Sequence, residues 1–321
     1  MDLIYTDKQR ADVGVLQDFT LDLAFGADEN DFELTVDLNR HCCEADCLVY
    51  VENTEYGGII DGLNIVTEED KLTYKGRTWQ GILASKVIEP EPGKAYLTVS
   101  GEANRVIGDL IVKLGLGDLL VASTENSGIT INSYSFNRYV DAYSGLSKML
   151  ELASGKLKFS FNGSRCVVSA KPSVDYSKDE EFDSDLVSMN ISKMTNKVNH
   201  LICLGKGELT DRLVIHMYAD EEGNISGTQT FRGTQEITAV YDYSSAESAE
   251  ELTESGREKF KEYINSNSVQ LDLSANDNTY DVGDIVGARE NITNTVTKAR
   301  ITKKIVTINK NEVNIQYKVG E

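Results

Sequence analysis

Residues 19–39, FTLDLAFGADENDFELTVDLN, decide the fold class of the first part of the chain. Successive side chains of a strand point to opposite faces, so apolar residues that alternate with polar ones predict half-buried strands. The same pattern continues to residue 92, with turn residues such as Gly57-Gly58 between the runs, and it predicts an antiparallel barrel or sandwich. The alternating apolar positions are Phe19, Leu21 and Leu23, then Phe32, Leu34, Val36 and Leu38.

The period changes in residues 93–172. Apolar residues at helical spacing predict a helix that ends near Gly115, and a second helix that starts at about Asp141 or Ser144 and ends before Gly155. A hairpin follows, with a type I′ turn expected at Asn162-Gly163. The apolar positions are Val106, Ile107, Leu110, Ile111 and Leu114, then Leu146, Met149, Leu150 and Ala153, then Leu157, Phe159, Phe161, Cys166, Val168 and Ala170.

Residues 173–321 return to strands, at 198–205, at 212–220 and in a closing hairpin. One helix is expected around 244–265, after a capping box at Ser244–Glu247. The closing hairpin is predicted to turn at Asn309-Lys310-Asn311 and to bury Ala299, Ile301 and Ile305, then Val313, Ile315, Tyr317 and Val319.

The prolines divide these parts, because proline removes a backbone donor and commonly marks connections. Pro90, Pro92 and Pro172 place boundaries near 92 and near 172–185, where the acidic run 179–185 is interpreted as a solvated linker. The sequence therefore predicts a β-rich α+β protein with three domains. These are a β-barrel domain at 1–92, a small inserted α+β domain at 93–172, and a second β-barrel domain at 173–321.

Composition excludes several classes of protein. The chain has 321 residues, and a length prior of about 150 residues per domain suggests roughly two domains. No apolar run approaches the length of a membrane span, and the charged start of the chain shows no secretory signal. The net charge of −20 disfavours specific binding to nucleic acid or to an anionic membrane, because both require clustered cations.

Metal and catalytic motifs are weak. The run from His41 to Cys47 contains Cys42, Cys43 and Cys47 but lacks the second ligand pair of a structural zinc site. Cys166 and Cys203 stand alone in apolar segments, and His200 and His216 are interpreted as packed or surface residues. Gly205–Glu208 is interpreted as a turn and Trp79 as a core anchor in a strand-like segment. We expect no catalytic residue, no cofactor and no metal, and therefore no enzyme.

Three stretches together resemble a known family: TYKGRTWQGILASKVIEP at 73–90, VNHLICLGKGELTDRLVI at 198–215, and the segment 280–320 with its YDVGDIVG loop. They are similar to the hub proteins of phage tails and phage-like particles, both the siphophage hub-like tail proteins and the central hub of myophage baseplates. The resemblance implies two tube-like barrels with an inserted α+β domain, and a homotrimer that forms a pseudo-sixfold ring.

The resemblance also implies partners and a location. A hub contacts the tail tube or tube-initiator protein, a spike or tip protein, baseplate wedge proteins and the tape-measure protein. DNA passes through the lumen without specific binding, and no membrane partner is implied. The location is the tail baseplate of a virion or phage-like particle, after synthesis in the bacterial host cytoplasm.

Two alternatives stay open. A tail-associated cell-wall hydrolase requires a pair of catalytic acids across a cleft, which a chain with 52 acidic residues neither reveals nor excludes. A monomeric carbohydrate- or peptide-binding module requires an exposed aromatic platform, for which Tyr241 and Tyr243 are candidates.

Overall fold

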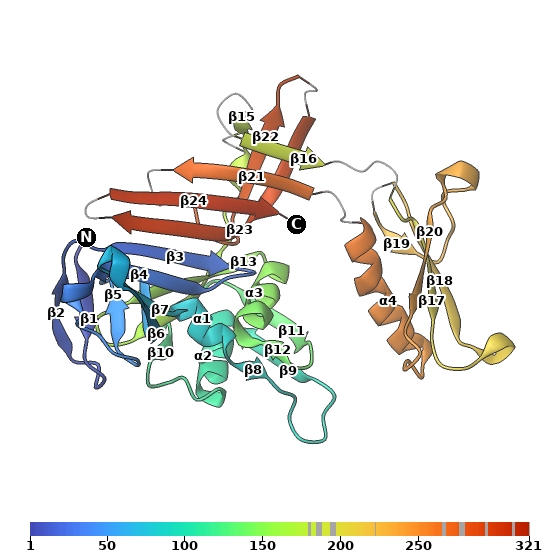
Figure 1. Ribbon diagram of the computed structural model, residues 1–321. Helices are drawn as coiled ribbons and strands as arrows, with labels where there is room; N and C mark the ends of the chain where they lie inside the picture. Colours follow the sequence, from blue (N-terminus) through green and yellow to red (C-terminus); the bar gives the residue numbers. More distant parts are fainter. Residues whose placement is uncertain are drawn as a thin grey trace. The chain divides into compact units, whose positions relative to one another are not determined.

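The computed structural model (Figure 1) describes residues 1–178, 181–183, 188–192, 197–221, 223–264, 268–275, 280–292, 295–309 and 312–320. The chain divides into a large unit, residues 1–189 with 271–320, and a small unit, residues 190–270. The domain limits expected at 92 and 172 do not coincide with this division, because residues 1–172 lie in one compact unit with the end of the chain.

The first segment is strand-rich, as predicted. The alternating residues Leu21, Leu23, Phe32 and Leu34 are all buried. Trp79 is buried as expected, but it begins a short helix and not a strand, because the Thr78 hydroxyl accepts a hydrogen bond from Gly81 N and caps that helix. The elements are β1 (Leu3–Thr6), β2 (Asp12–Leu16), β3 (Thr20–Gly26), β4 (Asp31–Asp37), β5 (Leu48–Tyr50), β6 (Gly57–Val66), β7 (Lys71–Thr78), α1 (Trp79–Ala84) and β8 (Val87–Ile88), with 3-10 turns at Leu38–Arg40 and Thr67–Glu69.

One large, mainly antiparallel sheet joins the beginning and the end of the chain. Its strands follow the order β21-β24-β23-β3-β4-β7-β6-β5-β1-β2. Strand β23 runs antiparallel to β3, from Lys303 opposite Gly26 to Asn309 opposite Thr20. The fold is therefore β-rich as predicted, but its organisation as two barrels is not confirmed. The later strands are β15 (Glu181–Asp183), β16 (Ser188–Ser192), β21 (Ser268–Ala275), β22 (Ile285–Glu290), β23 (Thr295–Asn309) and β24 (Glu312–Gly320).

A bulge in β23 changes which side chains face the core. The register with β24 shifts between Ile301 and Lys303. Ile301 is buried before the bulge, but Lys304 and Val306 are buried after it, and Ile305 is only half-buried. The prediction that Ile305 shares a face with Ile301 is therefore wrong. The expected turn residues Lys310 and Asn311, and most of the acidic run at 179–185, lie outside the described residues; residues 181–183 form β15.

The middle segment contains both predicted helices, α2 (Ala103–Lys113) and α3 (Ala142–Leu152). Asp141 caps α3 by accepting a hydrogen bond from Ser144 N at 2.9 Å. The predicted two-residue turn at Asn162-Gly163 is wrong, because Phe161 pairs with Cys166 and the loop between them has four residues. The strands are β9 (Leu97–Glu102), β10 (Leu120–Ala122), β11 (Thr130–Phe136), β12 (Val140–Asp141), β13 (Gly155–Phe161) and β14 (Cys166–Pro172), followed by a 3-10 turn at Tyr176–Lys178.

The first and middle segments share one hydrophobic core. The Trp79 ring stacks on the Phe161 ring with centroids 4.6 Å apart, and the Tyr50 ring is tilted against the same Phe161 ring with centroids 4.5 Å apart. Leu48 and Leu83 belong to the same cluster as Leu146 and the other buried residues of α2 and α3. Figure 1 shows α1, α2 and α3 together on one side of the strands β3 and β23. The core therefore continues across the boundary expected at residue 92.

The small unit is a sheet in the order β19-β18-β17-β20 with helix α4 packed on one face. Leu252 and Phe260 of α4 are buried against Cys203 and Met217. The capping box lies four residues later than predicted, because Ser248 Oγ, and not a Ser244 hydroxyl, accepts the hydrogen bond from Glu251 N. The elements are β17 (His200–Leu204), β18 (Val214–Ala219), β19 (Ile225–Ser226), β20 (Thr238–Asp242) and α4 (Ala249–Ile264), with 3-10 turns at Leu209–Asp211 and Gly233–Gln235.

Buried charges hold the segments of the large unit together. Lys304 is 1% exposed, and its Nζ lies 2.7 Å from Glu55 Oε1. Burial opposes the charge on Lys304, but the attraction and hydrogen bond of Glu55 outweigh it and raise the pKa of Lys304. Gln80 Nε2 donates to the second oxygen of Glu55 at 3.2 Å. This network links the first segment to β23.

Residues 280–284, with the sequence YDVGD, form a second buried ion pair with the middle segment. Lys156 Nζ lies 2.7 Å from Asp284 Oδ2, and Asp284 also accepts hydrogen bonds from the backbone of Val174 and Asp281. Gly283 has φ +98°, and a Cβ there would stand 2.8 Å from the Lys156 Cβ. A glycine is needed at this position because both the backbone conformation and the close approach exclude a side chain.

We predict that Glu55→Gln lowers the free energy of unfolding by about 3–5 kcal/mol, because it leaves the buried Lys304 charge without its partner. The double variant Glu55→Gln with Lys304→Met removes both charges and is expected to recover most of the loss. Urea unfolding followed by circular dichroism measures both variants. The loss should persist at neutral pH, since Glu55 raises the pKa of Lys304 and the buried lysine stays charged there. Equal stability of wild type and Glu55→Gln would contradict this role.

Candidate functional site

The outer half of β6 is a free strand edge. Strand β6 pairs with β7 along its length, but its pairing with β5 covers only Gly57, Gly58 and Ile59. In the part of the chain that the structure describes, no strand pairs with residues 62–66 on the side opposite β7. The backbone N–H and C=O groups on that side are therefore available to another strand.

Apolar side chains accompany this free edge. The register places Leu63 opposite Tyr74 and Ile65 opposite Leu72, and both partners are fully buried. Leu63 and Ile65 therefore lie on the core face of the sheet, yet they are 47% and 49% exposed. Their exposure places a half-covered apolar surface directly beside unpaired backbone groups.

A bulge separates the free half of β6 from its paired half. The register shifts between Ile60 and Gly62. Asp61, at the bulge, forms a bidentate ion pair with Arg77, with distances of 2.7 and 2.8 Å. Bulges bend a strand and increase its twist, which re-aims the residues beyond them. Residues 62–66 contain neither the lysine nor the proline that protects many edge strands.

Strand β2 provides a second free edge in the same sheet. Among the described strands, β2 pairs only with β1. Val13 and Val15 on β2 are 57% and 49% exposed. The two edges are similar in length and each carries two exposed apolar residues separated by one position. We refer to β2 and to residues 62–66 of β6 together as the free edges.

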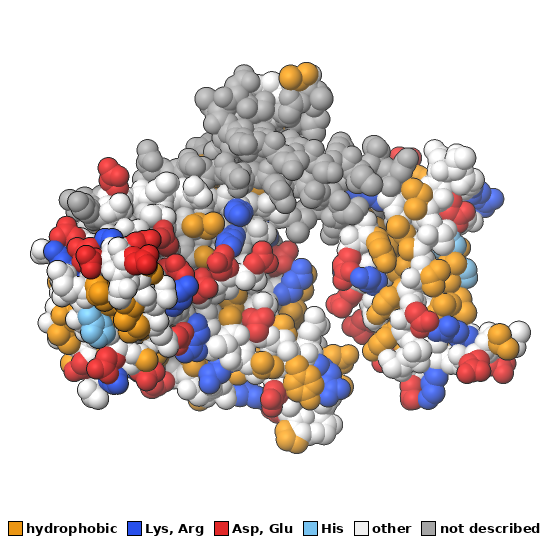
Figure 2. All heavy atoms as spheres, in the orientation of Figure 1, with side chains coloured by type: hydrophobic (Ala, Val, Ile, Leu, Met, Phe, Trp, Pro, Cys, Tyr) orange, Lys and Arg blue, Asp and Glu red, His pale blue; other side chains and the backbone are white. Residues whose placement is uncertain are grey.

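The opposite face of the large sheet is polar and carries both signs of charge. Lys75 lies 2.6 Å from Glu33, and Lys71 lies 2.7 Å from Asp37. Figure 2 shows acidic and basic side chains interspersed over the visible face of the large unit. Such exposed pairs contribute little to stability, about 0–1 kcal/mol each, but they keep this face solvated.

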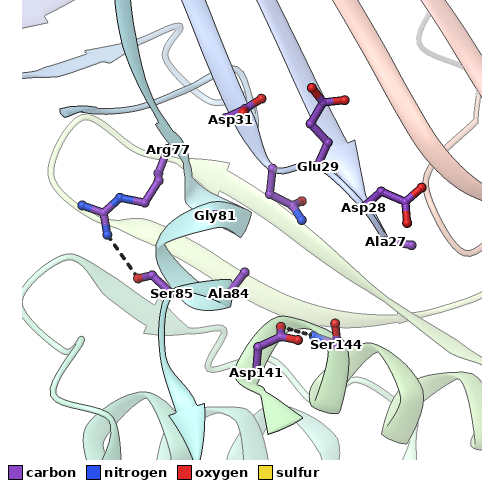
Figure 3. A pocket seen from close by; sticks show the side chains of 11 residues that line it. Ala27, Asp28, Glu29, Asp31, Arg77, Gly81, Ala84, Ser85, Asp141 and Ser144 are labelled. Carbon is purple, nitrogen blue, oxygen red and sulfur yellow. Dashed lines mark hydrogen bonds between the residues drawn. The ribbon is translucent and has the colours of Figure 1, made fainter. Parts of the chain in front are cut away.

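A cavity of about 410 Å³ lies between the β3–β4 loop, α1 and the start of α3. Figure 3 shows Asp28 and Glu29 on the loop, Asp31 at the start of β4, and Asp141 and Ser144 at α3. Burial and the neighbouring carboxylates Glu29 and Glu33 raise the pKa of Asp31. The other acids hold local structure, since Asp141 caps α3 and Glu29 pairs with Lys303. These contacts hold the β3–β4 loop in place, and we assign no chemical activity to the cavity.

The cysteines and histidines are distributed over separate places. All five cysteines are free thiols, and Cys166 and Cys203 are buried in the cores of the large and the small unit. His200 and His216 lie on adjacent strands of the small unit, with His200 Nε2 and His216 Nδ1 2.8 Å apart. Among the described residues, no group of three or more His, Cys, Asp or Glu is placed to hold a metal ion.

Tyr241 and Tyr243, the residues suggested for an aromatic platform, are only partly exposed. Both rings are half-buried against the core of the small unit, and Tyr241 Oη shares a 2.8 Å hydrogen bond with Ser255 Oγ of α4. Gly205–Glu208 lies in the connection between β17 and β18, as predicted for a turn. No helix within the described ranges is long and apolar enough to cross a membrane.

The free edges were not found from the sequence. Val13, Val15, Leu63 and Ile65 show the same alternation as residues that are buried, so periodicity alone does not distinguish a covered strand from an uncovered one. The only local signal is the absence of charge and proline within residues 62–66.

Three solved structures share the fold over nearly all of this chain, each at 11% sequence identity. The tail protein from Neisseria meningitidis MC58 has a TM-score of 0.55, with 100% of this chain and 96% of that chain covered. The 43 kDa tail protein of prophage MuSo2 from Shewanella oneidensis has a TM-score of 0.57, with 99% and 98% covered. The prophage tail protein gp18 from Listeria monocytogenes EGD-e has a TM-score of 0.56, with 99% and 94% covered.

No protein-family model and no curated protein sequence matches the chain. At 11% identity, the likeness to the three structures establishes a shared fold. The phage-tail fold expected from the sequence resemblance is therefore confirmed.

Proposed function

We propose that this chain is the structural hub of a phage or phage-like tail, in which three copies form a pseudo-sixfold ring that joins the tail tube to the distal baseplate, spike or tip. The observation that carries this proposal is the fold likeness to three phage tail proteins, which extends over at least 94% of each chain compared. A likeness over whole chains favours a role for the entire molecule over a role for one shared module.

The free edges offer a way to close such a ring. Pairing residues 62–66 of one copy with β2 of the next copy is a heterologous contact, which generates a ring when its rotation closes. It would supply partners for the free backbone groups and cover Leu63 and Ile65 with Val13 and Val15. Each of these half-exposed side chains would contribute about 1 kcal/mol on burial. Both edges belong to the large unit, so the ring would be built from one rigid sheet in each copy.

The net charge fits a ring that surrounds DNA. An acidic protein repels phosphate, so DNA would move through the lumen without binding to its wall. The same charge would keep free subunits apart and soluble before assembly. In this role the chain supplies geometry and binding surfaces and has no catalytic function.

The proposed partners are those of a hub. The ring would bind the tail tube or tube-initiator protein on one face and a spike or tip protein on the other. Baseplate wedge proteins would bind its rim, and the tape-measure protein would contact it during assembly. The protein would therefore be located in the tail baseplate of the particle, after synthesis in the host cytoplasm.

We predict that the purified chain forms a species of about 106 kDa, three times the 35.5 kDa of one chain. Light scattering on the eluting peak measures the mass, and negative-stain images of that peak should show rings. A single species of monomer mass at every concentration tested would contradict a ring that assembles from this chain alone.

We predict that Leu63→Lys and Val13→Lys each convert the trimer to monomer, because a charge on either free edge opposes the pairing of strands. Combining Leu63→Lys with Val13→Glu in one chain should restore the trimer, since opposite charges would then face each other. Light scattering and the melting temperature of each variant are the measurements.

Val112→Lys is the matched control for these variants. Val112 is 75% exposed on α2, outside the free edges, so this variant should remain trimeric. If Leu63→Lys and Val13→Lys also remain trimeric with unchanged melting temperatures, the ring does not close through the free edges. In that case the hub proposal is tested by the mass of the wild-type chain.

A further inference from the structure

Two consecutive cysteines bring their sulfur atoms together. Cys42 Sγ and Cys43 Sγ lie 3.5 Å apart in the connection between the 3-10 turn at Leu38–Arg40 and β5. In an extended chain, consecutive side chains point to opposite sides. The convergence of two neighbouring thiols therefore requires the backbone to bend at this point.

The Tyr74 hydroxyl holds that bend. Tyr74 Oη accepts a hydrogen bond from Cys42 N at 2.9 Å and another from Cys43 N at 3.1 Å. His41 Nδ1 lies 2.9 Å from the same oxygen. The Tyr74 ring is fully buried on β7, in the middle of the large sheet. The two thiols are thus positioned by a rigid element of the fold.

The two thiols have different surroundings. Cys43 is buried, whereas Cys42 is only half-buried, so a reagent from solvent reaches Cys42. The hydrogen bond with the Cys43 thiol, and to a smaller extent that with Tyr74, lowers the pKa of Cys42 to about 7. The same hydrogen bond and burial raise the pKa of Cys43. Cys42 is therefore the thiol that ionises near neutral pH and acts as the nucleophile.

We propose that Cys42 and Cys43 form a two-thiol site that reacts with hydrogen peroxide, with Cys42 as the attacking thiol and Cys43 as the resolving thiol. A low-pKa, accessible cysteine beside a second thiol is the arrangement that peroxide oxidises selectively. This proposal rests on the geometry around Tyr74 and is independent of the proposed ring.

The reaction has two steps. The Cys42 thiolate attacks one peroxide oxygen, the O–O bond breaks, and hydroxide leaves as the S–O bond of a sulfenic acid forms. The Cys43 sulfur then attacks the Cys42 sulfur, the S–O bond breaks, and the departing hydroxide takes the Cys43 thiol proton as water. The hydroxide released in the first step takes up the proton that Cys42 lost on ionising. Two thiols therefore lose two electrons to form one disulfide, and one peroxide is reduced to two water molecules.

The disulfide should be easily reversed. Consecutive Cα atoms are about 3.8 Å apart, below the roughly 4.4–6.8 Å that unstrained disulfides span. A strained disulfide is more readily reduced by a free thiol. Oxidation at this site would therefore be transient in a reducing compartment.

Mass spectrometry of the full chain tests the proposal. After one equivalent of peroxide, we expect a loss of two hydrogens that maps to the Cys42–Cys43 peptide. In Cys43→Ser, we expect a sulfenic acid on Cys42 that dimedone traps, with at least a tenfold higher yield than in wild type. The matched control is Cys47→Ser, which changes a buried thiol in the same loop and should behave like wild type. Accumulation in Cys47→Ser, or first oxidation at any other cysteine, would overturn the assignment.

The pH dependence provides a second test that does not require oxidation. The rate of Cys42 alkylation by iodoacetamide should rise with pH with a midpoint near 7, since only the thiolate reacts. Tyr74→Phe removes the positioning hydroxyl and should move the midpoint toward about 8.5, the value of an ordinary cysteine. Circular dichroism shows whether that variant is folded. A wild-type midpoint at or above 8.5 would overturn the proposal whether or not Tyr74→Phe folds.

Discussion

The large unit depends on the pairing of β23 with β3, which holds the end of the chain against its beginning. At one end of this contact, Gly26 N and Ala27 N lie beside the β23 bulge, where Ala27 N donates to the Thr302 carbonyl. A Cβ on Gly26 would stand 2.2 Å from that carbonyl oxygen, and Gly26 has φ +144°. Only glycine permits this approach. The bulge in turn decides that Lys304, and not Lys303, points into the core.

Buried charge then makes this register specific. A slip of one residue in β23 would remove Lys304 from Glu55 and turn the whole strand to the other face, because strand side chains have a period of two. The Lys156–Asp284 contact constrains the 280–284 loop in the same way. A buried ion pair adds little net stability compared with apolar residues, but a buried charge without a partner is costly. The two buried ion pairs therefore mainly destabilise alternative packings of the first, middle and last segments of the large unit.

Local periodicity predicted much of the secondary structure, and long-range contacts account for what it missed. The alternation of Leu21 and Leu23 and the helical spacing around Leu110 and Leu146 both led to elements that exist. The prediction that Ile305 is buried with Ile301 was wrong because the bulge in β23 depends on the pairing of that strand with β24. The exposure of Leu63 and Val13 could not be predicted from the sequence, because it depends on whether another strand pairs beside them. The resemblance of three separated stretches indicated the phage-tail fold that the structural comparisons confirm.

The free edges and the net charge act on association in opposite directions. Unpaired backbone beside apolar side chains favours pairing with any available strand, and a soluble monomer usually blocks such an edge with lysine, proline or a covering loop. A charge of −20 disfavours contact between copies over the whole surface. Only a contact that is directional and well matched in strand length overcomes this repulsion. Two such edges in one chain allow head-to-tail pairing between copies, and this pairing gives a closed ring when the rotation between copies closes and a filament when it does not.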